Sequence, residues 1–356
     1  MKHINILFFC VLLLICLSTV YSQEEFLVIC KEGTYKEVLK YIENGANVNY
    51  VSKYCYTPLI VASAFNEDEK VIRLLVEKGA SLDLIPIGWE SYFIKDYFEN
   101  KSEFDKIAFS NHSTSSYISE FKSSPLWFSA RYNKNEKVSE LLINLGVKIN
   151  ELLYYNDTPL NASFENPNKN LYKLFLKYGA DVNLGEIYGN SALQTISSQF
   201  TARFPLSVFQ DLIEHGARLN LPDTGRRHSI LISASSEQTP EVIEYLISSG
   251  ADVFETTSGN STPMHFAAND NNYPEVMDVF LKHGLDINAA NDYGDTPLII
   301  ACRYNTEEMI YKCLHLGASP YIVDKDGIPP LEIARKRFPS YEFMKKIGEI
   351  FLEREM

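Results

Sequence analysis

One short motif returns along the chain at a nearly constant interval. It consists of Thr or Ser before a short apolar run, and its copies begin at Thr57, Ser124, Thr158, Ser191, Ser229, Thr262 and Thr296. Thr158 and Ser191 are 33 residues apart, and Thr262 and Thr296 are 34 residues apart. A constant period of this length indicates one small unit that is repeated, so the core must be built by stacking units rather than by one globular packing.

A second motif follows the first in each unit. It is an apolar stretch that ends in Gly and a small or apolar residue, at Gly79-Ala80, Gly146-Val147, Gly179-Ala180, Gly216-Ala217, Gly250-Ala251, Gly284-Leu285 and Gly317-Ala318. Thr or Ser caps the start of a helix, and Pro suits the first helical position. Gly ends a helix well because it adopts the left-handed conformation without strain. Each unit therefore reads as two helices followed by a turn rich in Asp and Gly.

The two motifs together resemble the ankyrin repeat, whose pattern is T-P-L-H-x-A-A, a helical stretch, and then L-L-x-x-G-A-D-x-N. The closest unit here runs from Thr262 to Ala268 and on to Gly284-Leu285-Asp286-Ile287-Asn288. The resemblance covers nearly everything after residue 23. It implies an all-α ankyrin-repeat solenoid of stacked helix-turn-helix units, joined by hairpin-like turns. It also implies recognition of proteins through the concave face and the turn tips.

We expect the solenoid to span residues 23–356, with a C-terminal cap at 328–356. Two places interrupt the period. Thr57 and Ser124 are 67 residues apart without a clean motif between them, so we interpret 84–122 as one decayed repeat. Ser191 and Ser229 are 38 residues apart, which indicates about five inserted residues near 199–205, between two helices where a longer loop costs little.

The first 22 residues differ from the repeats. Lys2 and His3 precede an apolar run from Ile4 to Leu17, and small side chains follow up to Ser22. This is the form of a secretory signal peptide, with cleavage expected after Ser22 and a periplasmic or secreted mature protein. The alternatives are an uncleaved N-terminal anchor and a lipoprotein modified at Cys16. After cleavage, we expect no insertion into a membrane.

Removal of the signal leaves four cysteines, Cys30, Cys55, Cys302 and Cys313. The two pairs are many repeats apart, which exceeds the reach of a disulfide. Only Cys30–Cys55 and Cys302–Cys313 remain possible as bridges. Cys302 and Cys313 stand at apolar positions of the pattern, so we expect free, buried thiols.

The composition and the known site motifs argue against several functions. The net charge of −13 is unsuited to nucleic acid, because phosphate binding needs a basic face. The seven histidines form no cluster at metal-ligand spacing, and no phosphate loop or nucleophile elbow is present. We therefore expect no catalytic residue, no metal, no cofactor and no enzymatic activity.

Aromatic residues supply the candidate binding site. Tyr stands three residues before the capping Thr or Ser in four units, and Trp and Tyr occur in the first helix of another. The candidate partner-binding residues are Tyr54, Trp127, Tyr132, Tyr155, Tyr188 and Tyr293. Tyr suits recognition because it is amphipathic and loses little entropy on contact. The alternative is that each ring only packs against a neighbouring turn.

These features favour an exported, non-enzymatic module or scaffold that binds a protein partner, with the chain itself a monomer. Two other functions stay open. One is a secreted effector or toxin-neutralising protein, and the other is an accessory subunit of an envelope enzyme.

Overall fold

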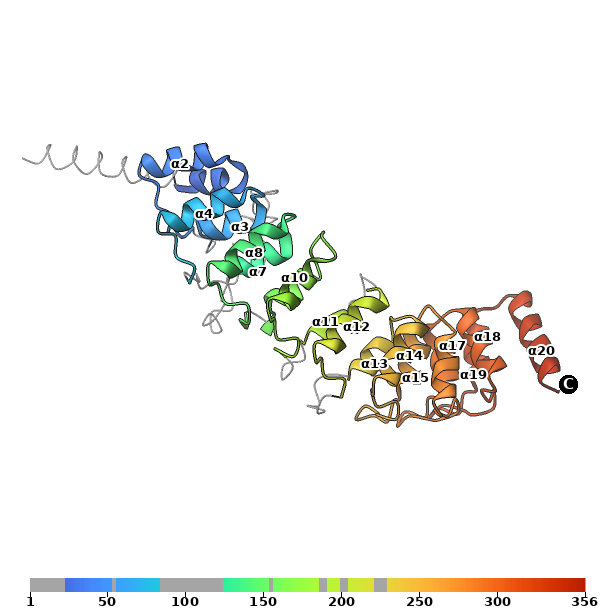
Figure 1. Ribbon diagram of the computed structural model, residues 1–356. Helices are drawn as coiled ribbons and strands as arrows, with labels where there is room; N and C mark the ends of the chain where they lie inside the picture. The colour runs from blue at the N-terminus through green and yellow to red at the C-terminus, as the bar shows by residue number, and fades with distance from the viewer. Residues whose placement is uncertain are drawn as a thin grey trace, which may run out of the picture. The chain divides into compact units, whose positions relative to one another are not determined.

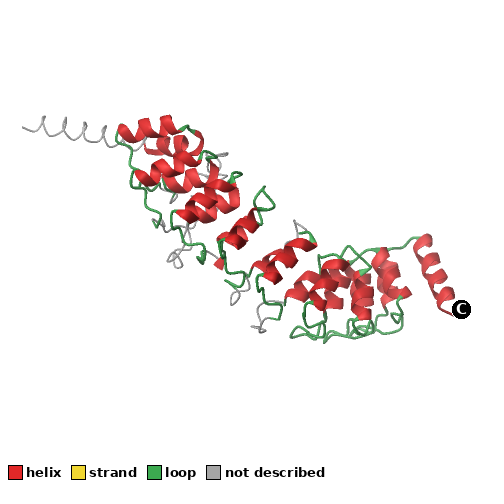
Figure 2. Cartoon of the chain, in the orientation of Figure 1, coloured by secondary structure: helices red, strands yellow, loops and turns green. Residues whose placement is uncertain are grey.

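The computed structural model describes residues 23–52, 56–83, 124–153, 156–185, 191–198, 204–220 and 229–355. Throughout these ranges the regular secondary structure is helical, without a β-strand (Figure 2). The chain divides into two compact units, Met1–Tyr188 and Gly189–Met356. Within each unit, the expected fold of stacked, all-helical helix-turn-helix repeats is confirmed.

In the first unit, helices alternate between two layers. The first helices of the repeats are residues 23–32, α3 (Pro58–Phe65), α7 (Pro125–Tyr132) and α9 (Pro159–Ser163). The second helices are α2 (Tyr35–Glu43), α4 (Glu69–Glu77), α8 (Glu136–Asn144) and α10 (Leu171–Lys177). First helices pack on first helices, α3 on α7 and α7 on α9, and second helices do likewise (Figure 1).

The second unit continues the same alternation. Its first helices are α11 (Ala192–Ser197), α13 (Ile230–Ser235), α15 (Pro263–Asp270), α17 (Pro297–Tyr304) and α19 (Pro330–Arg337). Its second helices are α12 (Leu206–Glu214), α14 (Pro240–Ser248), α16 (Val276–Lys282), α18 (Glu307–His315) and α20 (Tyr341–Glu355). First helices again pack on first helices, from α11 through α13, α15 and α17 to α19 (Figure 1).

The ends of the helices follow the signals in the sequence. Thr57 and Thr296 cap α3 and α17, each accepting a hydrogen bond from a backbone N–H three residues later. The helix-ending glycines all have positive φ, and that of Gly179 is 82°. A non-glycine residue meets steric strain at such an angle, so the glycines fix where each second helix stops.

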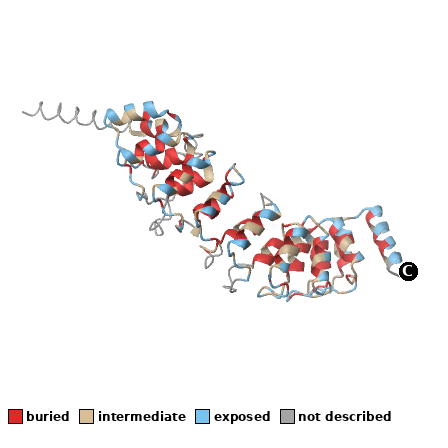
Figure 3. Ribbon diagram, in the orientation of Figure 1, coloured by how far each residue is buried: buried red, intermediate tan, exposed pale blue. Residues whose placement is uncertain are grey.

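The core lies between the helices of adjacent repeats. Every residue from Pro58 to Ala64 in α3 is buried, because this short helix is enclosed by its neighbours. By contrast, α4 buries Val71, Ile72, Leu74 and Leu75 and turns a polar face outward. Figure 3 shows this difference between the two helix layers.

Buried asparagines join five of the repeats to the repeat before them. The side-chain amide of Asn66 donates to the carbonyls of Cys30 and Gly33, at 3.1 and 2.9 Å. Four further asparagines make the same contact one repeat further on, and we call the set the asparagine ladder: Asn66, Asn133, Asn166, Asn271 and Asn305. These amides satisfy backbone carbonyls that would otherwise be buried without a partner at the ends of the first helices.

The asparagine ladder also shows which described repeats are neighbours in the first unit. Helix α3 packs directly on α7, and Asn133 donates to the carbonyls of Ser63 and Asn66, both at 2.9 Å. The segment 84–122, which the sequence predicts to be a decayed repeat, lies outside the described residues, so that assignment stays a prediction.

The thiols of Cys30, Cys302 and Cys313 are free and buried, as expected, and burial raises the pKa of Cys313 to about 12. Cys55 lies outside the described residues, as do residues 1–22 with the expected signal peptide. In the described ranges, no helix combines the length and apolar character needed to cross a bilayer. At the other end, α20 buries Phe343, Ile347 and Ile350, and the assignment of 328–356 as a cap stays a prediction.

Candidate protein-interaction surface

Tyr293 is the one member of the expected tyrosine row that lies within the described residues. It stands in the turn between α16 and α17, where its backbone N–H donates to Asn291 Oδ1 at 3.0 Å. A Cβ at Gly259, in the preceding turn, would lie 3.5 Å from its ring, and Lys325 Nζ, in the following turn, lies 5.9 Å from the ring centroid. The ring therefore packs along three consecutive turns and still exposes 59% of its surface. Tyr54, Tyr155 and Tyr188 lie outside the described residues.

Two exposed aromatic residues of the turns were missed from the sequence. Phe254 and Tyr321 stand four residues after a helix-ending Gly and are 65% and 84% exposed. Most units carry Asn at this place, and Asn220, for example, donates to the carbonyl of Gly250 at 2.8 Å. The signal that could have found them is the departure from Asn in the G-A-D-x-N pattern.

In the first unit, aromatic rings gather at the ends of the first helices. The centroid of the Tyr132 ring lies 6.0 Å from that of Phe65 and 6.3 Å from that of Trp127. Trp127 is only 4% exposed, and its indole N–H donates to Asp157 Oδ2 at 2.7 Å. Its ring therefore offers little surface to a partner, whereas Tyr132 and Phe65 are half-buried.

Charged side chains complete this cluster. The guanidinium of Arg131 lies 5.2 Å from the ring centroid of Trp127 and forms an ion pair with Glu165 of the next repeat. Lys31 Nζ lies 5.6 Å from the ring centroid of Phe65. The side chains Lys31, Phe65, Arg131, Tyr132 and Glu165 form what we call the helix-end row.

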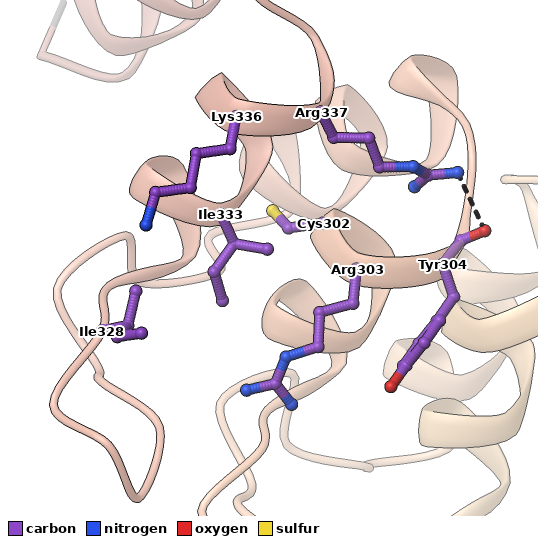
Figure 4. A pocket seen from close by; sticks show the side chains of 7 residues that line it. All are labelled: Cys302, Arg303, Tyr304, Ile328, Ile333, Lys336 and Arg337. Carbon is purple, nitrogen blue, oxygen red and sulfur yellow. Dashed lines mark hydrogen bonds between the residues drawn. The ribbon is translucent and has the colours of Figure 1, made fainter.

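The corresponding place in the second unit is hollow. A depression of about 520 Å³ lies between α17 and α19, and we call it the helix-end groove. Its lining consists of Cys302, Arg303, Tyr304, Ile328, Ile333, Lys336 and Arg337 (Figure 4). Cys302 is fully buried behind Ile333, while the Tyr304 side chain is 60% exposed.

Two of the arginines of the groove are held by neighbouring groups. The guanidinium of Arg303 lies 2.5 Å from both Asp295 Oδ2 and Asp324 Oδ2. The pKa of Asp324 is lowered, first by the backbone N–H of Ile328 and also by Arg303. Arg337 takes the place of the asparagine in the last rung of the ladder and donates to the carbonyls of Tyr304 and Asn305.

The described residues do not bring together a metal-binding cluster. Within them, no three His, Cys, Asp or Glu side chains gather closely enough to hold a metal ion. His265 is buried beside the N-cap of α15, where its Nδ1 accepts from the backbone N–H of Thr262 at 3.1 Å. Burial lowers its pKa to about 4, so the ring is neutral and serves to hold the turn.

Comparison with known proteins identifies the repeats independently. A family model of three consecutive ankyrin repeats matches residues 197–291, 230–324 and 264–343, and a model of a single ankyrin repeat matches residues 54–85. Together these matches span half of the chain. An ankyrin repeat protein of fowlpox virus (strain NVSL) is 29% identical over 113 residues, which are 32% of this chain and 15% of the viral protein.

Proposed function

Because the chain belongs to the ankyrin-repeat family, whose members are interaction modules, we propose that it binds a protein partner through its turn tips and first helices. In the family these parts line the concave face. The proposal includes the absence of an enzymatic activity of its own. Fold alone does not assign function, so the proposal must rest on the surface of this chain.

The observation that carries the proposal is the exposure of large aromatic side chains along successive turns. Tyr293 and Phe254 each leave more than half of their surface to solvent, although their rings lie beside glycines of the neighbouring turns. An aromatic ring has only two χ angles, so it loses little entropy when a partner covers it. Interface energy is concentrated in such Tyr and Trp anchors, where truncation costs about 2 kcal/mol or more.

We further propose that the mature chain acts outside the cytoplasm. The support is the form of residues 1–22, with basic residues, an apolar run and small side chains before Gln23. An exported binding module would meet its partner in the periplasm or beyond it.

A binding experiment on the mature chain tests this function. Residues 23–356 are immobilised, a partner is recovered from envelope extract and identified by mass spectrometry, and the purified partner is then titrated. We expect the double variant F254A/Y293A to weaken binding at least tenfold with an unchanged melting temperature. The control is Y341A, which removes an exposed aromatic ring from the second-helix layer. Equal losses in the two variants, or no loss in either, would place the binding surface elsewhere.

A further inference from the structure

We propose that the helix-end groove between α17 and α19 binds an acidic peptide segment that inserts one aliphatic side chain. This inference rests on the proposed function as a protein-binding module and names the chemistry of the partner at one site.

The same tripeptide, Arg-Tyr-Asn, ends two first helices. It is Arg131-Tyr132-Asn133 in α7 and Arg303-Tyr304-Asn305 in α17. Both asparagines belong to the asparagine ladder, so the tripeptides occupy equivalent places in their repeats. The two tripeptides differ in the residue of the next repeat that lies beside their arginine.

In the first unit, the next repeat offers a carboxylate. Glu165, which directly precedes the ladder residue Asn166, forms an ion pair with Arg131. In the second unit, Lys336 holds that position, directly before Arg337. Because the neighbour is now a cation, Arg303 is paired with Asp295 and Asp324 of the turns instead. The groove therefore lacks the carboxylate that the chain itself supplies in the first unit.

Two cations of the groove lack a strong carboxylate partner. Arg337 donates to backbone carbonyls and has no carboxylate partner in the described parts of the chain. Lys336 pairs with Glu332 on the same exposed helix, with 2.9 Å between Nζ and Oε1. Such an exposed pair contributes little free energy, so a ligand carboxylate can replace Glu332. The rim therefore favours an anionic group in a chain that is otherwise acidic.

The floor of the groove selects an apolar side chain. Ile333 and Ile328 line it, with Cys302 behind, and the exposed ring of Tyr304 forms one wall (Figure 4). A volume of about 520 Å³ accommodates a Leu-sized side chain together with adjoining backbone. RNA fits less well, because it carries no aliphatic side chain to cover Ile328 and Ile333.

Fluorescence anisotropy on residues 23–356 tests the inference with three labelled probes. The first is the peptide Glu-Asp-Glu-Leu-Glu-Asp-Glu, the second replaces Leu by Ser, and the third is a ten-nucleotide poly(U). We expect saturable, salt-sensitive binding of the Leu peptide, at least tenfold weaker binding of the Ser peptide, and weaker binding still of the RNA. Absence of saturable Leu-peptide binding, or stronger binding of the RNA, would overturn the inference.

Two variants locate the site, and one serves as control. Lys336→Glu restores the carboxylate of the first unit, so it should abolish peptide binding without lowering the melting temperature. Tyr304→Ala should weaken it at least tenfold, because it removes an exposed wall. Lys345→Glu changes an exposed lysine of α20 and should leave binding unchanged. If Lys336→Glu binds the peptide normally, the groove is not the site. A partner recovered from extract that binds this variant normally would then leave the proposed function intact.

Discussion

Asn271 shows how much one side chain does in this fold. Its amide donates to the carbonyls of Ser235 and Gln238, while its own Oδ1 accepts from the backbone N–H of Tyr273 at 2.8 Å. One buried residue thus satisfies three backbone groups and connects two repeats. Asparagine is suited to this task because it carries two donors and an acceptor on a short side chain.

Replacing Asn271 by Ala should therefore lower stability by about 1–3 kcal/mol, since it leaves buried carbonyls without a donor. The comparison is Asn49→Ala, which removes a similar bond to the Gly79 carbonyl at an exposed turn. There water takes the place of the amide, so the loss should stay below about 1 kcal/mol. Urea unfolding of both variants measures the difference, and equal midpoints would contradict it.

Gly179 gives a second prediction at the scale of one residue. Its φ is 82°, and a Cβ there would meet no heavy atom within 4 Å. The cost of Gly179→Val is therefore conformational rather than steric crowding, and should be about 1 kcal/mol or more. Gly179→Asn should cost less, because Asn156 and Asn260 already adopt φ near 60° in this chain, at 59° and 57°. A lower melting temperature for Gly179→Asn than for Gly179→Val would contradict this prediction.

Glu255 makes part of the stability depend on pH. Burial and the nearby Asp252 raise its pKa to about 7, from 4.5 for an unperturbed glutamate. Between pH 4.5 and 7 the folded state binds more protons at this group than the unfolded state, so the stabilisation present below 4.5 is lost as the pH rises through 7. Glu255→Gln keeps an acceptor for the Ser229 hydroxyl but carries no charge.

The difference in unfolding free energy between Glu255→Gln and the native chain should thus be small at pH 4.5 and should grow in favour of Gln up to pH 8. Measuring the difference cancels the opposite contribution of His265, which both proteins share. A difference that does not change with pH would show that Glu255 titrates normally.

At the scale of the elements, the junction between α3 and α7 shows which parts of the chain build the stack. Asp83 and Ser124 occupy the places that Asn288 and Thr296 hold in a complete repeat, where only Ala289 to Asp295 separate them. Helices α3 and α7 already pack together, although about 40 residues of chain separate Asp83 from Ser124. We expect a chain in which Ala289–Asp295 is copied in place of residues 84–123 to fold with a melting temperature at or above that of the native chain.

Circular dichroism and a thermal melt of this shortened chain measure the effect, with a deletion of the α9–α10 repeat as the control that should destabilise. Collapse of the shortened chain would mean that the removed segment supports the neighbouring repeats.

The elements differ in how far the sequence determined them. Helix starts at Thr57 and Thr296 and the end at Gly179 follow from local chemistry, and all three were predicted correctly. The contact of α3 with α7 could not be predicted from a period, because a period counts residues and does not say which of them join the stack. The burial of Trp127 depends on Asp157 of the next repeat, and the helix-end groove depends on Lys336, which lies opposite Arg303. Neither feature could be predicted from the sequence, because each depends on how adjacent repeats pack.

For the whole molecule, the prediction concerns export. If residues 1–22 are a cleaved signal, the mature protein should begin at Gln23 and be recovered in the soluble envelope or culture fraction. N-terminal sequencing and intact mass measure this directly. An intact Met1 would indicate a retained anchor, and a fatty-acylated Cys16 would indicate a lipoprotein.

The asparagine ladder also has a consequence for how such a chain changes in evolution. Each amide of the ladder binds backbone carbonyls, which a repeat offers whatever its side chains are. A repeat can then be duplicated, lost or moved out of the stack without new side-chain contacts having to evolve at the junction that remains. The length of the binding face is therefore free to vary in whole repeats, while the aromatic and charged residues at its edge change independently.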